Sequence, residues 1–234
     1  MARWGRAFAI LKRTVPPGER VLDLGCAFGY GTAKIASLYS TDGLDASAAY
    51  VARARRAVPA ARFVVGQAER LPYTDGSFGA VVLLDVLEHV SDESAVIAEV
   101  ARVLKPSGVL VLSVPHTGLL RWWDSLNVYA WLSGEDGLAP PGVRATGACF
   151  HRHYSVAALR GLLGPRFVIE SSYESGLGLA EFVHLPLLLL CKKVLRAAWL
   201  YALLQYVYYG AYILEDAFPA PRAGYHLTVV ARRI

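Results

Sequence analysis

Short apolar runs alternate with longer segments of mixed polarity along most of the chain. The runs have the length of strands and end in turn residues, whereas the mixed segments repeat apolar residues at helical spacing. Strands are predicted at residues 20–24, 41–45, 62–66, 78–84, 109–114, 167–171 and 225–232. Helices are predicted at residues 31–39, 46–57, 91–104 and 155–163, the third with Ser91 as its N-cap. Residues 105–108 are predicted to form a turn. The alternation indicates an α/β fold with a parallel sheet and helices on both faces.

The most apolar part of the chain, residues 177–214, lies between the last two predicted strands. Residues 197–214 contain no charged side chain, and this run reaches the lower limit of about 18 residues for a membrane-spanning helix. A single span is nevertheless not expected, because the chain must return to the sheet and the preceding apolar piece, 183–191, is too short to cross. We therefore predict a hydrophobic helical insertion over residues 177–216.

Three roles are open for this insertion. It can close a hydrophobic pocket as a lid, rest on a membrane as an interfacial hairpin, or provide ordinary helix packing or a homodimer interface. Basic side chains beside aromatic ones suit a lipid headgroup boundary, and the insertion contains Lys192, Lys193, Arg196, Trp199 and Tyr201. A second segment, residues 116–150, gathers glycine, proline and tryptophan and is predicted to be a loop or lid.

Composition limits the cell compartments and the classes of partner that we expect for this chain. The 234 residues are 55% hydrophobic and 18% charged, with a net charge of +5, which suits one domain with an insertion. The basic residues are scattered, without zinc-finger spacing or an RNA-binding signature, so a nucleic-acid partner is not expected. Cys26, Cys149 and Cys191 imply no disulfide framework, and charged residues interrupt the first 17 residues, so no signal peptide is expected. We expect a cytoplasmic location, with the inner face of the membrane as the alternative.

A glycine-rich turn follows the first predicted strand. Residues 23–29 (DLGCAFG) join that strand to a helix, and their glycines allow the main chain to approach a nucleotide-like ligand. The strict dinucleotide fingerprint is not satisfied, because Ala27 stands where it requires glycine. Taken alone, this turn is a weak signal.

Polar groups at the ends of the next strands strengthen it. Asp45 ends the second strand, where a carboxylate can accept ribose hydroxyls. Residues 66–69 (GQAE) end the third strand, and residues 85–90 (DVLEHV) follow the fourth. Because open α/β sheets bind ligands at the carboxyl ends of their strands, these groups are expected to share one site.

Together these motifs resemble the class I S-adenosylmethionine-dependent methyltransferases, in particular the type 11 branch with its quinone-biosynthesis and small-molecule enzymes. The segments that match its motifs in order are VLDLGCAFGYG, GLDAS, GQAERLPYTDGSFGAVV, LLDVLEHV and EVARVLKPSGVLVLSVP, from residue 21 to residue 115. The resemblance implies a single methyltransferase domain over residues 1–234. It also implies a Rossmann-like seven-stranded sheet whose last strand, residues 225–232, runs antiparallel between the fifth and the sixth.

The same resemblance implies S-adenosylmethionine as cofactor, with S-adenosylhomocysteine as product. The residues that would bind it are Asp23, Gly25, Ala27, Gly29, Asp45, Ala46, Gln67, Ala68, Glu69 and Asp85. The glycine-rich turn would contact the methionine and ribose, Asp45 the ribose hydroxyls, residues 67–69 the adenine, and Asp85 would lie near the sulfonium. Two positions depart from the family's pattern. Ala27 replaces a glycine and is expected to need a negative φ, and Gln67 stands where aspartate is common.

Methyl transfer from a sulfonium needs positioning above all, and a base only where the nucleophile carries a proton. His116 and His89 are the candidate catalytic residues, although His89 can equally begin a helix. For His151, His153 and Tyr154 we favour capping and packing of the following helix. A metal held by His116, Asp124, His151 and His153 is not expected, because the spacing of these residues is unspecific.

The sequence therefore predicts a methyltransferase that acts on an oxygen or carbon atom of a hydrophobic small molecule. Two alternatives remain. One is a non-catalytic, membrane-associated binding module with the same fold, and the other is an NAD-dependent oxidoreductase, against which Ala27 and the antiparallel last strand argue.

Overall fold

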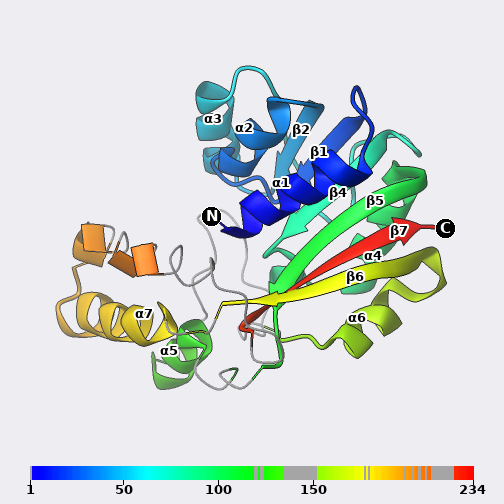
Figure 1. The fold of residues 1–234 in the computed structure, drawn as a ribbon. Helices are drawn as coiled ribbons and strands as arrows, with labels where there is room; N and C mark the ends of the chain where they lie inside the picture. Colours follow the sequence, from blue (N-terminus) through cyan, green and yellow to red (C-terminus); the bar gives the residue numbers. More distant parts are fainter. Residues whose placement is uncertain are drawn as a thin grey trace.

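A mixed sheet of seven strands forms the centre of the computed structural model (Figure 1). The structure describes residues 2–118, 121, 124–133, 152–176, 178, 180–197, 199–201, 203–204, 207–208, 210–211 and 224–234. The strands are β1 (Arg20–Leu24), β2 (Ser40–Asp45), β3 (Arg62–Val65), β4 (Phe78–Leu84), β5 (Leu104–Pro115), β6 (Phe167–Ser175) and β7 (His226–Arg233). Their order is β3-β2-β1-β4-β5-β7-β6.

The direction of the last strand confirms the predicted fold. Strands β1 to β5 pair in parallel, whereas β7 pairs antiparallel with both β5 and β6. In the β5–β7 register Pro115 lies opposite His226, so β7 begins where β5 ends. The first residues of β7 therefore lie at the same edge of the sheet as the last residues of the parallel strands.

Helices cover both faces because alternate strand residues point to opposite sides. The helices are α1 (Ala2–Thr14), α2 (Tyr30–Ala36), α3 (Ala48–Ala57), α4 (Glu93–Val103), α5 (Ser125–Ser133), α6 (Val156–Leu163) and α7 (Ala180–Leu188), with short 3-10 turns η1 (Leu87–His89) and η3 (Gly164–Arg166). Along β5, Leu110 and Leu112 pack with α4 and α6, whereas Val109 and Val111 pack with α1 and α2. The predicted two-sided core is therefore confirmed.

Two helices were missed in the sequence. In α1 the residues Ala7, Ile10 and Leu11 are buried against the sheet, at the spacing of one helical face. The basic residues that obscured this pattern lie on the rest of the helix. The second, α5, lies in the segment predicted as a loop.

Two local predictions were wrong. Residues 105–108 do not leave the sheet, because Leu104 already pairs with Phe78 and the extra length is absorbed as an irregularity in which Ser107 has φ +62°. Helix α4 begins at Glu93 with Asp92 as its N-cap, its carboxylate accepting the Ala95 N–H at 2.9 Å. Ser91 is engaged elsewhere, since its hydroxyl donates to Glu69.

The insertion is helical, as predicted, in its described part. Helix α7 continues as a π-helix, η4 (Leu189–Val194), and the described residues between 199 and 211 are again helical. This helical hairpin projects from the sheet beside α5 (Figure 1). Within the described part of the chain, no helix is long and apolar enough to cross a membrane. Cys26 and Cys191 are buried free thiols, and Cys149 lies outside the described residues.

The placement of α1 gives a test on two helix glycines. A Cβ on Gly31 of α2 would lie 2.1 Å from the Trp4 ring of α1, whereas a Cβ on Gly161 of α6 meets nothing within 4 Å. We expect Gly31→Ala to lower the free energy of unfolding by about 1–2 kcal/mol through overpacking. Gly161→Ala should raise it by about 0.5–1 kcal/mol, since alanine favours helix. Urea unfolding measures both, and stabilisation by both variants would show that α1 does not pack on α2 in this way.

Candidate functional site

The turn after β1 is held close to two neighbouring strands. The backbone N–H groups of Gly25 and Cys26 donate to the Leu44 carbonyl of β2 at 2.7 and 3.0 Å. Gly25 and Gly29 have φ of +84° and +81°. A Cβ on Gly25 would lie 2.2 Å from Cγ2 of Val86, just after β4. Glycine at position 25 is therefore required both by backbone conformation and by the approach of β4.

The expectation of a negative φ at Ala27 was wrong. Ala27 has φ +43°, although left-handed backbone costs an ordinary residue about 1–2 kcal/mol. Two hydrogen bonds hold this conformation: the Ala27 N–H donates to Oδ2 of Asp45 at 2.9 Å, and the Gly29 N–H donates to the Cys26 carbonyl at 2.8 Å. Ala27 is therefore held in a left-handed conformation, the region of φ that glycine adopts most easily.

Asp45 is the polar centre of this part of the site. Its Oδ2 accepts from Ala27 and its Oδ1 accepts the Ser47 N–H at 2.8 Å, so both oxygens are fixed at the end of β2. A carboxylate oxygen has two lone pairs, and each oxygen thus keeps capacity for a further donor. This pair of acceptors fits a nucleoside, because a fixed, half-buried carboxylate is suited to the two hydroxyls of a ribose. Ala46 lies between Asp45 and Ser47 in the sequence. The assignment of Asp45 and Ala46 to the cofactor stays a prediction.

Asp23 lies beneath the turn. Its side chain is almost fully buried, and Thr32 of α2 donates to its Oδ2 at 2.5 Å. Burial raises the pKa of this carboxyl from 3.8 to about 7, the nearby Asp45 charge adds to the rise, and the Thr32 hydrogen bond opposes it. In this structure Asp23 joins the turn to α2 rather than presenting its carboxyl at the surface of the site.

The three predicted adenine residues differ in their surroundings. Gln67 is exposed beyond β3, Ala68 is buried in the main core, and Glu69 is half-buried. Oε1 of Glu69 accepts both the N–H and the hydroxyl of Ser91, at 3.2 and 3.1 Å. Glu69 thereby anchors the start of α4, which leaves Gln67 as the accessible polar side chain of the three. Their contact with adenine stays a prediction.

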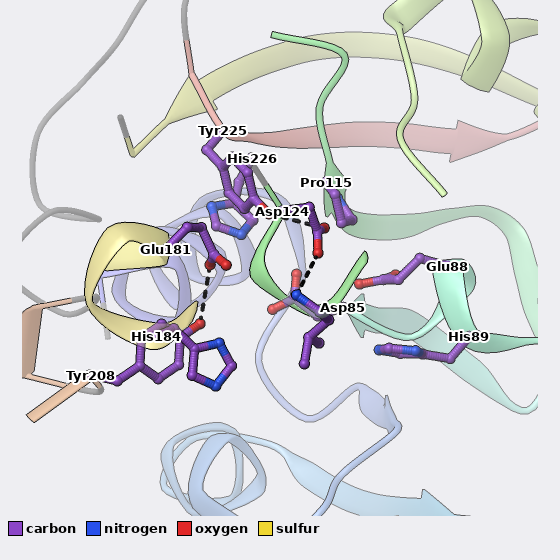
Figure 2. A pocket seen from close by; sticks show the side chains of 11 residues that line it. Asp85, Glu88, His89, Pro115, Asp124, Glu181, His184, Tyr208, Tyr225 and His226 are labelled. Atoms are coloured by element: carbon purple, nitrogen blue, oxygen red, sulfur yellow. Dashed lines mark hydrogen bonds between the residues drawn. The ribbon is translucent and has the colours of Figure 1, made fainter. Parts of the chain in front are cut away.

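A second region of the site is a pocket of about 110 Å³ at the same edge of the sheet (Figure 2). Asp85, with φ +56°, lies at its centre and follows β4, while its backbone N–H donates to the Ser113 carbonyl of β5 at 2.9 Å. Asp85, Glu88 and His89 lie across the pocket from the residues of the helical hairpin (Figure 2). The remaining lining residues are Pro115, Asp124, Leu126, Glu181, His184, Tyr208, Tyr225 and His226.

Two buried carboxylates fix the far wall of this pocket. Asp124 caps α5 by accepting the Leu126 and Asn127 N–H groups, each at 3.0 Å, and it accepts the Tyr225 hydroxyl at 3.0 Å. Burial, together with the Asp124 and Glu181 charges, raises the pKa of Tyr225 well above its usual value. The Tyr225 phenol is therefore a hydrogen-bond donor and not a base.

Glu181 of α7 fixes the helical hairpin. Its Oε2 accepts the Ser125 hydroxyl at 2.5 Å, and Nδ1 of His184 lies 2.6 Å from the same hydroxyl oxygen. The Tyr208 hydroxyl donates to Oε1 of Glu181 at 3.3 Å, and the Tyr208 ring stacks on His184 at 4.0 Å. Neighbouring residues Asp124 and Ser125 thus link the sheet to the hairpin.

The two candidate catalytic histidines have different places. His89 lines the pocket, whereas His116 lies outside its lining and directs Nδ1 to the Gly224 carbonyl at 3.0 Å. Sequence reasoning missed His226 and Glu181. The position of His226 could have been inferred from the antiparallel β7, whose first residue must lie at this edge, but nothing local in the apolar insertion marks Glu181.

The other histidines form no metal site in the described residues. No group of three or more histidine, cysteine or acidic side chains there is arranged to hold a metal ion. His153 lies 3.5 Å from Asp124, the Tyr154 hydroxyl donates to Glu93 and to the Leu87 carbonyl, and Ser155 caps α6. His151 lies outside the described residues.

The buried Asp23 gives a pH test. Between its ordinary pKa of 3.8 and its folded pKa of about 7, the folded chain binds more protons than the unfolded chain, so stability falls as pH rises. Asp23→Asn removes this titration and keeps a hydrogen-bond acceptor for Thr32. Its free energy of unfolding, relative to the parent chain, should therefore increase as urea unfolding is repeated from about pH 5 to about pH 8. A constant difference over this range would contradict the raised pKa.

Comparison with known proteins identifies the domain. Residues 22–112 match the family described as "Methyltransferase domain". A demethylmenaquinone methyltransferase of Beutenbergia cavernae is 42% identical over 102 residues, which are 42% of this chain and 41% of that protein. A 2-methyl-6-phytyl-1,4-hydroquinone methyltransferase of Synechocystis is 36% identical over 118 residues, which are 48% of this chain and 36% of that protein. The chain thus spans less than half the length of these two relatives.

A solved structure agrees with the fold over nearly the whole chain. An S-adenosylmethionine-dependent methyltransferase of Methanosarcina mazei superposes with a TM-score of 0.64 over 96% of this chain and 97% of that one, at 20% identity, which shows the shared fold. Residues 22–112 therefore match the methyltransferase-domain family, an enzyme family for which S-adenosylmethionine is the implied cofactor.

Proposed function

We propose that this chain transfers a methyl group from S-adenosylmethionine to an oxygen or carbon atom of a hydrophobic small molecule whose reacting end is polar. The observation that carries this proposal is the meeting of two regions at one sheet edge. The turn and Asp45 form the first region and fit a nucleoside, and the pocket from Asp85 to His226 forms the second. Val86, packed against Gly25, joins them.

The nature of the acceptor is supported by the pocket and the relatives together. The lining includes four carboxylates, three histidines and two tyrosines, which suits a hydroxylated head group. The apolar insertion beside it suits a hydrocarbon part. Two relatives are named for demethylmenaquinone and for 2-methyl-6-phytyl-1,4-hydroquinone, and the second name joins a hydroquinone ring to a phytyl chain. A membrane surface and a second copy of the chain remain the two predicted macromolecular partners.

The cofactor, when bound, supplies an electrophilic methyl group on a sulfonium. What the protein must add is orientation and, for a hydroxyl acceptor, removal of a proton. We assign proton removal to His89, which lines the pocket beside Glu88 and Asp85. The His89 imidazole would accept the proton of the acceptor O–H as the oxygen forms its bond to the methyl carbon, while the carbon–sulfur bond breaks and S-adenosylhomocysteine leaves as the neutral thioether. The Tyr225 hydroxyl, whose proton is donated to Asp124, would accept a hydrogen bond from a hydroxyl of the head group and so help to orient it.

The turn after β1 and Asp45 form the donor half of the site, and direct measurement of cofactor binding tests it. Asp45→Ala should weaken binding of S-adenosylhomocysteine tenfold or more, on the order of 1.5–3 kcal/mol, because it removes the charged acceptor of the ribose hydroxyls. Ser47→Ala is the control: it removes the α3 cap and about 1 kcal/mol of stability, but keeps the Asp45 carboxylate, so affinity should stay unchanged. Calorimetry measures both. Tight NADH binding without S-adenosylhomocysteine binding would replace this proposal with the oxidoreductase.

The base is tested by kinetics on two histidines. His89→Gln should lower kcat about a hundredfold with little change in the KM of the acceptor, since the general base is lost. His116→Gln should leave both constants near those of the parent chain. Transfer of labelled methyl to a phytyl hydroquinone measures both variants. The reverse ranking would make His116 the base, and cofactor binding without transfer to any hydroquinone tried would favour the non-catalytic module.

A further inference from the structure

The helical hairpin buries polar side chains that face the pocket and exposes apolar side chains on its other side. On α7, Glu181 and His184 are buried and face the pocket, in contact with Tyr208 of the second helix (Figure 2). Buried charge and imidazole are costly in a protein interior and are here satisfied by hydrogen bonds to Ser125. The inner face of the hairpin therefore carries polar groups toward the pocket, next to Leu185 and Leu188, which pack with Tyr129 of α5.

The outer face consists of apolar residues at helical spacing. On α7 and η4 the exposed positions recur every four residues at Phe182, Pro186 and Leu190. On the second helix they recur at Trp199, Leu203 and Val207, with 72%, 60% and 58% of each residue exposed. Both helices therefore present an apolar stripe to the solvent. A water-facing helix normally has the opposite arrangement, so this face is suited to an apolar environment.

The charge of the hairpin identifies that environment. Residues 182–214 contain three basic residues, Lys192, Lys193 and Arg196, and no acidic one, and Glu181, just before them on α7, is buried toward the pocket. All three lie where η4 ends and the chain turns toward the second helix. The Lys192 ammonium lies 5.0 Å from the Tyr201 ring centre, and the exposed Lys193 donates to the neutral Leu132 carbonyl. Apolar stripes beside cations and an exposed tryptophan match an anionic lipid surface, where the stripe enters the acyl boundary and the cations meet the headgroups.

We propose that the helical hairpin docks this protein on anionic membranes through its outer face, defined by Phe182, Leu190, Trp199, Leu203 and Val207. The inner face then closes the polar pocket from the membrane side. Docking itself is independent of catalysis, whereas delivery of a lipophilic acceptor from the bilayer to the pocket rests on the proposed function. A second copy of the chain fits this face less well, because each copy brings the same three cations and no acidic residue to it.

Sedimentation with vesicles tests the proposal on the full chain. The parent protein should bind phosphatidylglycerol-containing vesicles at least about tenfold more tightly than pure phosphatidylcholine vesicles, and salt should weaken the binding. The variant Trp199→Ser/Leu203→Ser/Val207→Ser should lose binding to both, about tenfold or more. Lys193→Gln/Arg196→Gln should lose only the preference for anionic lipid.

A matched control removes three exposed apolar side chains elsewhere. Leu38→Ser/Val168→Ser/Ile234→Ser replaces residues of 48%, 54% and 72% exposure that lie outside the hairpin, and it should bind vesicles as the parent does. Equal binding by the parent and the outer-face variant would overturn the proposal. The proposal would also be overturned if the parent failed to bind vesicles and instead formed a dimer, measured by analytical ultracentrifugation, that the outer-face variant does not form.

Cofactor binding separates this failure from failure of the proposed function. All of these substitutions are on exposed residues outside the donor half of the site, so S-adenosylhomocysteine affinity should match that of the parent. If the parent binds S-adenosylhomocysteine but does not bind vesicles, only the docking proposal is rejected. Vesicle binding that follows the pattern above, in a protein that never transfers methyl, rejects the proposed function alone.

Discussion

The site depends on the hydrogen bonds that tie the turn after β1 to the end of β2. Leu44 accepts the Gly25 and Cys26 N–H groups, and Asp45 accepts the Ala27 N–H. These bonds fix the turn in a left-handed conformation that would otherwise be unfavourable at alanine. They also fix the Asp45 carboxylate, so one set of contacts shapes both the backbone and the charge of the donor half.

The pocket from Asp85 to His226, which the proposed function makes the acceptor half of the site, is also built on buried carboxylates that accept from backbone N–H and hydroxyl groups. Asp124 holds the start of α5 and Tyr225, and Glu181 holds Ser125 and Tyr208. Because Asp124 and Ser125 are neighbours, the sheet and the helical hairpin share one polar junction. The hairpin can therefore turn polar groups to the pocket and leave its outer face apolar.

Much of the fold follows from sequence pattern because most of the parallel strands are short apolar runs that end in turn residues, and the last residues of parallel strands fall at one edge of the sheet. Strand β2 (STDGLD) is the exception in composition, and its place follows from the alternation of strands and helices. This is why Asp45 and Asp85 could be assigned to one site. The antiparallel β7 came from the family resemblance, not from its periodicity. Helix α1 was missed because its four basic residues mask a narrow apolar stripe of Ala7, Ile10 and Leu11.

Other features depend on contacts that no local pattern encodes. The positive φ of Ala27 follows from a hydrogen bond to a residue 18 positions away. Glu181 and His184 lie in a segment whose composition indicates only apolar packing, and their partner Ser125 lies 56 to 59 positions earlier. If the insertion is a lid, the pocket beside it was expected to be hydrophobic, whereas its lining is largely polar and comes from residues far apart in the sequence.

The central claim is that the donor and acceptor halves meet at the end of β4. A crystal structure of the full chain with S-adenosylhomocysteine tests it most directly. The account predicts ribose hydroxyls on the Asp45 carboxylate and the sulfur directed toward the pocket that Asp85 and His89 line. A nucleoside bound away from Asp45, or a sulfur directed away from that pocket, would contradict it.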